Sequence, residues 1–347
     1  MLYQELGRTG IPVSKYGLGV MTFGGQTAEA ESLRQLDMAR DAGITLFDTA
    51  ENYPTPISAE TQGRSEAILG AWLSAHGGRD KVVIATKVAG PGNAAGDMRH
   101  IRGDARRLDR ANIRAALEGS LRRLNTDYVD LYQVHWPERA VTTNGRARFS
   151  LVPDAPGQVP IEETLGVLGE LVTEGKVRAI GVCNESPWGV MRYLAEADRA
   201  GLPRLASIQN GYSLLDRSFE LGLAEIAMRE AVGLLAYSPL ARGTLTGKYR
   251  DRSGLEAGQS QAFVTRMLSD NRRRAIDAYA QLADQNGLPL AHMALAFAAR
   301  QPFLGSVLMA ASSCDQLAAN LGAIEVRLGQ DIVKAINAIH DAHANPL

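Results

Sequence analysis

Cysteine is scarce in this chain, with only Cys183 and Cys314 among 347 residues. Two cysteines are too few for a disulfide framework, and they are typical of a protein from a reducing compartment. Long hydrophobic runs are also missing, and the first residues show no apolar stretch behind basic residues. We therefore expect a cytoplasmic protein without a membrane segment.

An excess of charge of either sign is the third absence. The 37 lysines and arginines nearly balance the 38 aspartates and glutamates. A chain this close to neutrality has no general electrostatic attraction to nucleic acids or anionic membranes, and neither is expected as a partner. By contrast, hydrophobic residues make up 45% of the chain, which is ordinary for a globular enzyme with a large core.

Short apolar runs alternate with amphipathic segments of helical length. The apolar runs predict eight strands, at residues 16–20, 45–48, 82–86, 128–134, 179–182, 206–209, 233–237 and 306–309. Helices are predicted at residues 29–42, 65–75, 112–124, 161–174, 188–200, 219–230, 271–285, 290–300, 314–324 and 330–344. This alternation is typical of an α/β fold of the (β/α)8 TIM barrel type. We expect one domain over residues 1–347.

Three segments fall outside the repeat. The alternating residues around Gly7 and Gly10 predict a β-hairpin ahead of the first strand. Residues 138–160 and 241–269 predict long loops after the fourth and seventh strands. Long ordered loops in a compact domain are usually functional.

Polar side chains close three successive predicted strands. Asp48 ends the second, Lys87 the third and His135 the fourth, and Tyr53 follows Asp48 by a few residues. The C-terminal strand ends carry the active site in barrels of this kind. Singly, each residue has a structural explanation, such as a helix cap, a core histidine or a surface lysine. Together they favour catalysis.

These residue types can make a proton donor for a carbonyl. Lys87 is expected to lower the pKa of Tyr53 below its usual value near 10, and Asp48 to keep Lys87 protonated. A neutral His135 would orient the carbonyl oxygen while Tyr53 gives up its proton.

Several segments, in order along the chain, resemble the aldo-keto reductase family: GLGVMTFGG, FDTAENY, IATK, VDLYQVHW, IGVCN, IQNGYSLLDR and AYSPLARGTLTGKY. QGRSEAILGAWL and NTDYVDLYQVHWPER are similar to the bacterial Tas-type, NADP(H)-dependent branch. The resemblance implies a barrel that binds NADP(H) and reversibly reduces aldehydes or ketones to alcohols. It places a catalytic tetrad on Asp48, Tyr53, Lys87 and His135.

The same resemblance implies cofactor contacts. Asn184 and Gln209 are expected to hydrogen-bond the nicotinamide carboxamide, and Tyr237 to stack on the ring. The remaining expected contacts are Met21 and, along the phosphates, Ser238, Leu240, Arg242, Gly243 and Lys248, with Ser312, Ser313, Gln316 and Asn320 at the adenine 2′-phosphate end. Cys183 and Gln316 depart from the family's usual serine and basic residue.

An apolar mouth is expected around Tyr53, suited to aldehydes and small aromatic ketones. Met21, Phe23, Trp136, Trp188 and Tyr212 would line it, and we assign the last four to substrate binding. The sequence does not name the physiological substrate, the strength of the preference for NADPH over NADH, or the oligomeric state.

Two other functions stay open. Lys87 could form a Schiff base in an aldolase, although Asp48 argues against an uncharged lysine. The chain could also be a non-catalytic, NADPH-binding regulatory subunit. GLGVMT lacks the third glycine of a dinucleotide fingerprint, GTLTGKY is one residue short of a P-loop, and His340 and His343 have no evident third ligand, so no metal site is predicted.

Overall fold

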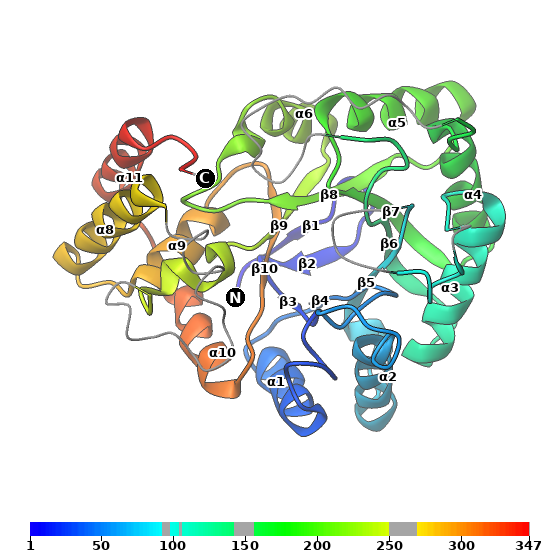
Figure 1. The fold of residues 1–347 in the computed structure, drawn as a ribbon, viewed down its shortest axis with the longest axis horizontal. Helices are drawn as coiled ribbons and strands as arrows, with labels where there is room; N and C mark the ends of the chain where they lie inside the picture. The colour runs from blue at the N-terminus through cyan, green and yellow to red at the C-terminus, as the bar shows by residue number, and fades with distance from the viewer. Residues whose placement is uncertain (92–97, 104–105, 142–155, 250–268, 347) are drawn as a thin grey trace.

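A closed barrel of eight parallel strands forms the centre of this computed structural model, which describes residues 1–91, 98–103, 106–141, 156–249 and 269–346 (Figure 1). The barrel strands are β3 (Tyr16–Gly19), β4 (Leu46–Asp48), β5 (Val83–Val88), β6 (Val129–Val134), β7 (Val177–Cys183), β8 (Leu205–Gly211), β9 (Gly233–Tyr237) and β10 (Leu304–Met309). Neighbours in the barrel are neighbours along the chain, and β10 closes against β3. The predicted (β/α)8 barrel is confirmed.

Helices cover the outside of the barrel (Figure 1). They are α1 (Glu29–Asp41), α2 (Arg64–His76), α3 (Arg110–Leu124), α4 (Ile161–Thr173), α5 (Pro187–Ala200), α6 (Leu223–Glu230), α8 (Asp270–Gln285), α9 (Leu290–Ala299), α10 (Cys314–Leu321) and α11 (Gln330–Ala342). Short 3-10 helices are η1 (Arg79–Lys81), η3 (Ser218–Glu220), η4 (Ala241–Thr246) and η5 (Gly322–Glu325). The helix predicted at 219–230 is divided, because Gly222 adopts a φ of 101° between η3 and α6. The one predicted at 314–324 divides into α10 and η5.

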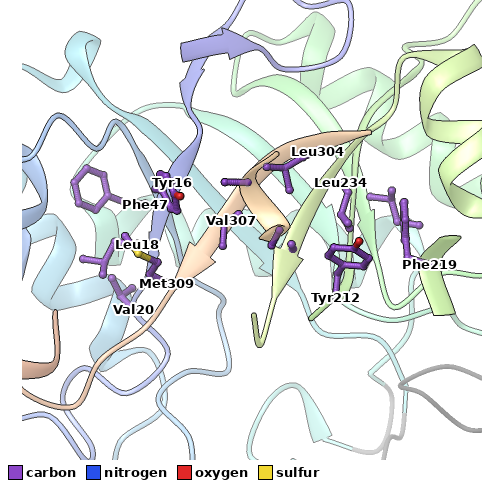
Figure 2. Close-up of a cluster of buried hydrophobic side chains, with 14 of the residues drawn as sticks. Tyr16, Leu18, Val20, Phe47, Tyr212, Phe219, Leu234, Leu304, Val307 and Met309 are labelled. Atoms are coloured by element: carbon purple, nitrogen blue, oxygen red, sulfur yellow. The ribbon is translucent and has the colours of Figure 1, made fainter. Parts of the chain in front are cut away.

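The period of two along each strand decides which side chains point into the barrel. In β5, Val83 and Ala85 belong to the cluster inside the barrel, whereas Ile84 and Val88 belong to the larger core. Lys87 is the next inward-pointing residue of β5. Its ammonium group therefore lies inside the barrel, next to the apolar cluster. Figure 2 shows part of the larger core.

The predicted N-terminal hairpin is present. Its strands, β1 (Tyr3–Glu5) and β2 (Pro12–Ser14), pair antiparallel. Leu6, Ile11 and Val13 from this hairpin are fully or almost fully buried in the cluster inside the barrel, with Leu46 and Val83 from the first residues of two barrel strands. The hairpin therefore closes the N-terminal end of the barrel, and the opposite end carries the polar strand ends.

The two long loops are described only in part. Residues 142–155 of the first and 250–268 of the second lie outside the described residues. The second begins as η4, which the sequence did not predict. Among the described residues, no helix is both long and apolar enough to cross a membrane.

A buried ion pair at the N-terminal end of the barrel provides a test of stability. Asp130 is fully buried and accepts hydrogen bonds from Arg178 at 2.7 Å and the Ile84 N–H at 2.9 Å, while Arg79 lies 2.7 Å from it. We expect Arg79→Met to lower the free energy of unfolding by about 1.5–3 kcal/mol, measured by urea denaturation. The exposed pair of Arg229 and Glu225 is the control, and Arg229→Met should change the value by less than about 0.5 kcal/mol. An equal loss of unfolding free energy in the two variants would contradict a stabilising role for the pair of Arg79 and Asp130.

Candidate active site

A buried ion pair lies at the centre of the C-terminal end of the barrel. The Lys87 Nζ donates to Asp48 Oδ2 at 2.6 Å and to the Thr49 carbonyl at 2.7 Å. Both side chains come from inward positions on the neighbouring strands β4 and β5. Tyr53 belongs to the loop after β4, and its ring centroid is 5.1 Å from Nζ. The structure therefore brings these three predicted residues together.

The Lys87 ammonium is held in its charged form. Burial disfavours the charge, but the charge and hydrogen bond of Asp48, together with smaller effects of Tyr53 and Cys183, raise the pKa of Lys87 above its usual value. Asp48 Oδ1 in turn accepts a hydrogen bond from Gln209 at 2.8 Å and a longer one from Gln133 at 3.3 Å. Both oxygens of the carboxylate are thus satisfied inside the barrel.

Tyr53 differs from the expectation in one respect. Burial raises the pKa of its phenol, and the positive charge of Lys87 acts in the opposite direction, with a net value of about 12. The prediction that Lys87 brings this pKa below 10 is therefore wrong for this structure, because desolvation of the phenolate outweighs one nearby charge. Tyr53 keeps its proton at neutral pH, which is the form that a proton donor requires.

His135 completes the set and is neutral. Its ring lies 5.6 Å from the Tyr53 ring, nearly perpendicular to it at 83°. Burial, assisted by the charge of Lys87, lowers the pKa of His135 well below its usual 6.5. Within the described part of the chain, its buried Nδ1 has no hydrogen-bond partner. An unpaired buried polar atom costs about 1–3 kcal/mol, so a ligand that pairs with it is favoured.

The expected nicotinamide contacts surround these four residues. Tyr237 donates a hydrogen bond to Asn184 Oδ1 at 2.8 Å, and Asn184 Nδ2 donates to the His135 carbonyl at 2.9 Å. Gln209 is bonded to Asp48, as described above. Cys183 is buried, and its pKa is raised to about 12 by burial, so it is a thiol. These side chains are interlinked rather than free.

The segment after β9 has an unusual backbone. Ser238, Ala241 and Arg242 all have positive φ, at 53°, 48° and 58°, and Gly243 has a φ of 85°. This turn is closed by its own backbone, since the Ala241 N–H donates to the Ser238 carbonyl at 2.8 Å and the Gly243 N–H donates to the Leu240 carbonyl at 2.9 Å. Leu240 packs against the core below it.

Three cationic residues lie in or near this segment: Arg242, Lys248 and Arg272. Among the described residues, no ion pair joins Arg242 to a carboxylate. The nearby Arg272 of α8 was not predicted; in the part of the chain that is described, its buried Nε has no hydrogen-bond partner. Lys248 lies over the ring of Tyr249 at 5.0 Å. The positive charges of the two arginines suit a diphosphate. Only the run NRRRA hinted at Arg272 in the sequence.

At the expected 2′-phosphate end, a carboxylate already occupies the helix N-terminus. Glu31 of α1 accepts the Cys314 N–H at 2.5 Å, at the first residue of α10. This hydrogen bond and Arg34 lower the pKa of Glu31 to about 2, so it is ionised. Ser313 caps the helix through the Gln316 N–H. Ser312 donates to the Gln316 side chain at 3.0 Å. Asn320 is buried further along the same helix. No sequence pattern indicated that Glu31 would contact the first residue of α10.

The predicted mouth is only partly assembled. Phe23 is fully buried in the core, and Tyr212 is buried against Phe297 with its hydroxyl bonded to Glu220. Figure 2 shows Tyr212 within the larger core. These two are core residues and do not line a mouth, because aromatic residues beside a strand end can turn outward into the helix layer.

The other three aromatic or apolar candidates lie at the surface or at the site. Trp136 stacks near His135 with ring centroids 4.5 Å apart. Met21 is 41% exposed, and Trp188 is 62% exposed on α5, where Arg139 covers one face. The Met21 carbonyl accepts the Thr55 N–H at 2.8 Å, in the loop that carries Tyr53. The roles of Met21, Trp136 and Trp188 stay predictions.

The geometry can be compared with known proteins. Residues 15–341 match the model of the aldo/keto reductase family. The chain belongs to this family. It is 47% identical to Protein tas of Escherichia coli (strain K12) over 348 residues, covering 100% of this chain and 99% of the relative.

More distant relatives extend the comparison. The chain is 34% identical to the uncharacterized oxidoreductase YrpG of Bacillus subtilis (strain 168), over 98% of this chain and 96% of the relative. It is 31% identical to a probable voltage-gated potassium channel subunit beta of Oryza sativa subsp. japonica, with 98% and 96% covered. Membership makes this chain an oxidoreductase of a family that uses nicotinamide cofactors and acts on small carbonyl compounds.

The neutral state of His135 predicts a dependence of stability on pH. The unfolded chain takes up a proton at this side chain near pH 6.5, whereas the folded chain does so only at much lower pH, so acidification below about 6.5 favours unfolding. Relative to His135→Gln, the wild type should lose up to about 1.4 kcal/mol more per pH unit across this window. Urea denaturation from pH 7 to 4.5 measures it, and parallel curves for the two proteins would contradict a neutral His135.

Proposed function

We propose that this protein catalyses the reversible NADP(H)-dependent reduction of aldehydes or ketones, with Tyr53 as the general acid. The observation that carries the proposal is the joint placement of a protonated phenol, a charged lysine and a neutral histidine at one end of the barrel. Tyr53 lies 5.1 Å from the Lys87 Nζ and 5.6 Å from the His135 ring. Such a group can donate a proton to a carbonyl oxygen as negative charge develops there.

Each residue of the tetrad has a separate task. Bound NADPH supplies the hydride. Tyr53 supplies the proton to the oxygen of the carbonyl, and the Lys87 ammonium stabilises the phenolate that remains. Asp48 keeps Lys87 charged and in place through the 2.6 Å contact. His135, whose Nδ1 has no partner among the described residues, orients the carbonyl.

Residues expected at the cofactor fit a dinucleotide. Asn184, Gln209 and Tyr237 surround the tetrad and offer amide and phenol groups to the nicotinamide end. The neighbouring positive charges of Arg242 and Arg272 suit the diphosphate. Ser312, Ser313 and Gln316 lie at the start of α10, where we propose the 2′-phosphate end.

A Schiff-base aldolase is disfavoured. A lysine that attacks a carbonyl must lose its proton, and the pKa of Lys87 is raised by Asp48. Borohydride trapping with a carbonyl substrate tests this alternative, because a covalent adduct on Lys87 would contradict the reductase proposal. A regulatory role is the second candidate, since one relative is named as a probable potassium channel subunit beta.

The general acid can be tested directly. We expect Tyr53→Phe to reduce the rate of NADPH oxidation by about 10²–10⁴-fold across a panel of aldehydes and ketones, because it removes the proton donor. The absorbance of NADPH measures the rate, and binding of NADPH should persist. Tyr16→Phe is the matched control: its buried hydroxyl bonds the Ala323 carbonyl at 3.2 Å, away from the site. A full rate in Tyr53→Phe would exclude it as the acid, and a wild type that binds NADPH without turnover would favour a regulatory role.

Glu31 predicts how the preference for NADP(H) can be changed. Its carboxylate lies on the Cys314 N–H at the start of α10 and repels a phosphate bound there. Glu31→Gln removes this charge and frees Arg34, so we expect the ratio of NADP+ to NAD+ affinity to rise about tenfold, which corresponds to about 1.4 kcal/mol. Dissociation constants from fluorescence quenching measure the ratio. Glu29→Gln, on the same helix, should leave it unchanged; an equal change for both cofactors in Glu31→Gln would contradict the prediction.

A further inference from the structure

A second buried ion pair lies beside the proton donor. Glu51 precedes Tyr53 by two residues and is 2% exposed. Its Oε1 accepts the Ala89 N–H at 2.6 Å and a hydrogen bond from Arg102 Nη2 at 2.8 Å, and Oε2 accepts from Arg102 Nη1. The carboxylate is therefore held on one side by the backbone after β5 and on the other by a guanidinium group.

Arg102 is itself fixed by several contacts. Its Nη2 also donates to the Ala89 carbonyl at 3.2 Å, and its Nε donates to Asn112 Oδ1 at 3.0 Å. Asn112 lies in the first turn of α3, where its N–H is bonded to Asp109, the helix cap. Arg102 has a φ of 56°, a left-handed conformation that costs free energy for a residue with a side chain. A strained backbone kept at a buried contact indicates that the surrounding structure imposes this geometry.

The pair joins two strand ends that must be aligned. Glu51 belongs to the loop after β4, which carries Tyr53, and Ala89 follows β5, which carries Lys87. The backbone hydrogen bond from the Glu51 N–H to the Lys87 carbonyl is long, at 3.3 Å. The hydrogen bond from the Ala89 N–H to the Glu51 side chain is shorter, at 2.6 Å. The tighter link between the two segments is therefore made by the Glu51 carboxylate.

We propose that Glu51 and Arg102 are a positioning pair that holds the Tyr53 loop against the end of β5 and so sets the separation of the Tyr53 phenol from the Lys87 ammonium. This inference rests on the proposed function of Tyr53. It extends that function to two residues whose side chains, within the described ranges, form hydrogen bonds with each other and with the backbone after β5 rather than with the tetrad side chains. A displacement of about 1 Å at a reacting group can cost about 10²-fold in rate. The charged groups that act on the Tyr53 phenol are Lys87 and Asp48.

A loss of stability alone would not show that Glu51 and Arg102 position Tyr53, because any buried ion pair affects stability. Replacing a buried ion pair with apolar residues is often neutral or favourable, whereas removing one partner leaves an uncompensated charge. Asp130 and Arg79 form another buried carboxylate and arginine pair at the opposite end of the barrel, where Arg178 is a second partner of Asp130. This pair therefore serves as a matched control for loss of stability without displacement of Tyr53.

The test compares Arg102→Met, Arg102→Lys and Glu51→Gln with Arg79→Met, using the full chain and NADPH. We expect Arg102→Met to lower kcat about 10–100-fold with an NADPH dissociation constant within about twofold of the wild type. With NADPH deuterated at the transferred hydrogen, the isotope effect on kcat should rise, because the chemical step becomes slower than product release. Arg102→Lys should recover part of the rate, since a charge remains but the bidentate contact does not.

Loss of folded protein would give a different pattern. It lowers kcat in proportion to the active fraction and leaves the isotope effect unchanged, as we expect for Arg79→Met. If Arg102→Met shows that pattern too, or if its kcat lies within about twofold of the wild type, the proposal is overturned. Should Arg102→Met not fold, Glu51→Gln decides by the same criteria, because it keeps the shape of the side chain.

Hydrogen exchange separates this inference from the proposed function. We expect peptides covering residues 49–63 to exchange faster in Arg102→Met, while β6 and β7 exchange as in the wild type. A wild type without turnover would refute the proposed function and leave the exchange comparison intact. Unchanged exchange in residues 49–63 would refute the positioning pair whatever the turnover.

Discussion

The contact between Lys87 and Asp48 is the interaction on which the rest of the site depends. An ammonium and a carboxylate are both taken out of water inside a barrel whose lower layers are apolar, and this desolvation costs several kcal/mol per ion. The cost is offset by direct attraction at 2.6 Å and by further hydrogen bonds to Thr49, Gln209 and Gln133. Each of those partners comes from a different strand or strand end, so satisfying one ion pair ties together β4, β5, β6 and β8.

Burial decides the protonation states around this pair. It lowers the pKa of His135, with the charge of Lys87 acting in the same direction, and it raises the pKa of Tyr53 against the charge of Lys87. The result is a neutral imidazole and a protonated phenol next to a fixed cation. Two further carboxylates link segments that are distant in sequence: Glu51 pairs with Arg102, and Glu31 of α1 accepts the Cys314 N–H at the start of α10.

Much of the fold could be predicted because strand periodicity and the positions of Asp48, Lys87 and His135 are local properties of the sequence. The division of the helix at 219–230 could not, since it depends on a glycine in an unusual conformation. Phe23 and Tyr212 were predicted at a mouth and lie in the core, because the direction of a ring is decided by the helices that pack over it. The raised pKa of Tyr53 likewise depends on burial, which no residue pattern reveals. Glu31, Glu51, Arg102 and Arg272 were missed because each acts on a segment distant in sequence.

The hairpin packed into the N-terminal end of the barrel limits how ligands enter and leave the protein. Leu6, Ile11 and Val13 fill that end together with the first residues of the barrel strands. The barrel is therefore open only at its C-terminal end. A molecule that reaches Lys87 must leave past the same side chains that it passed on entry. Binding and release share one route, so loops at the rim that tighten the hold on one ligand also delay the departure of another.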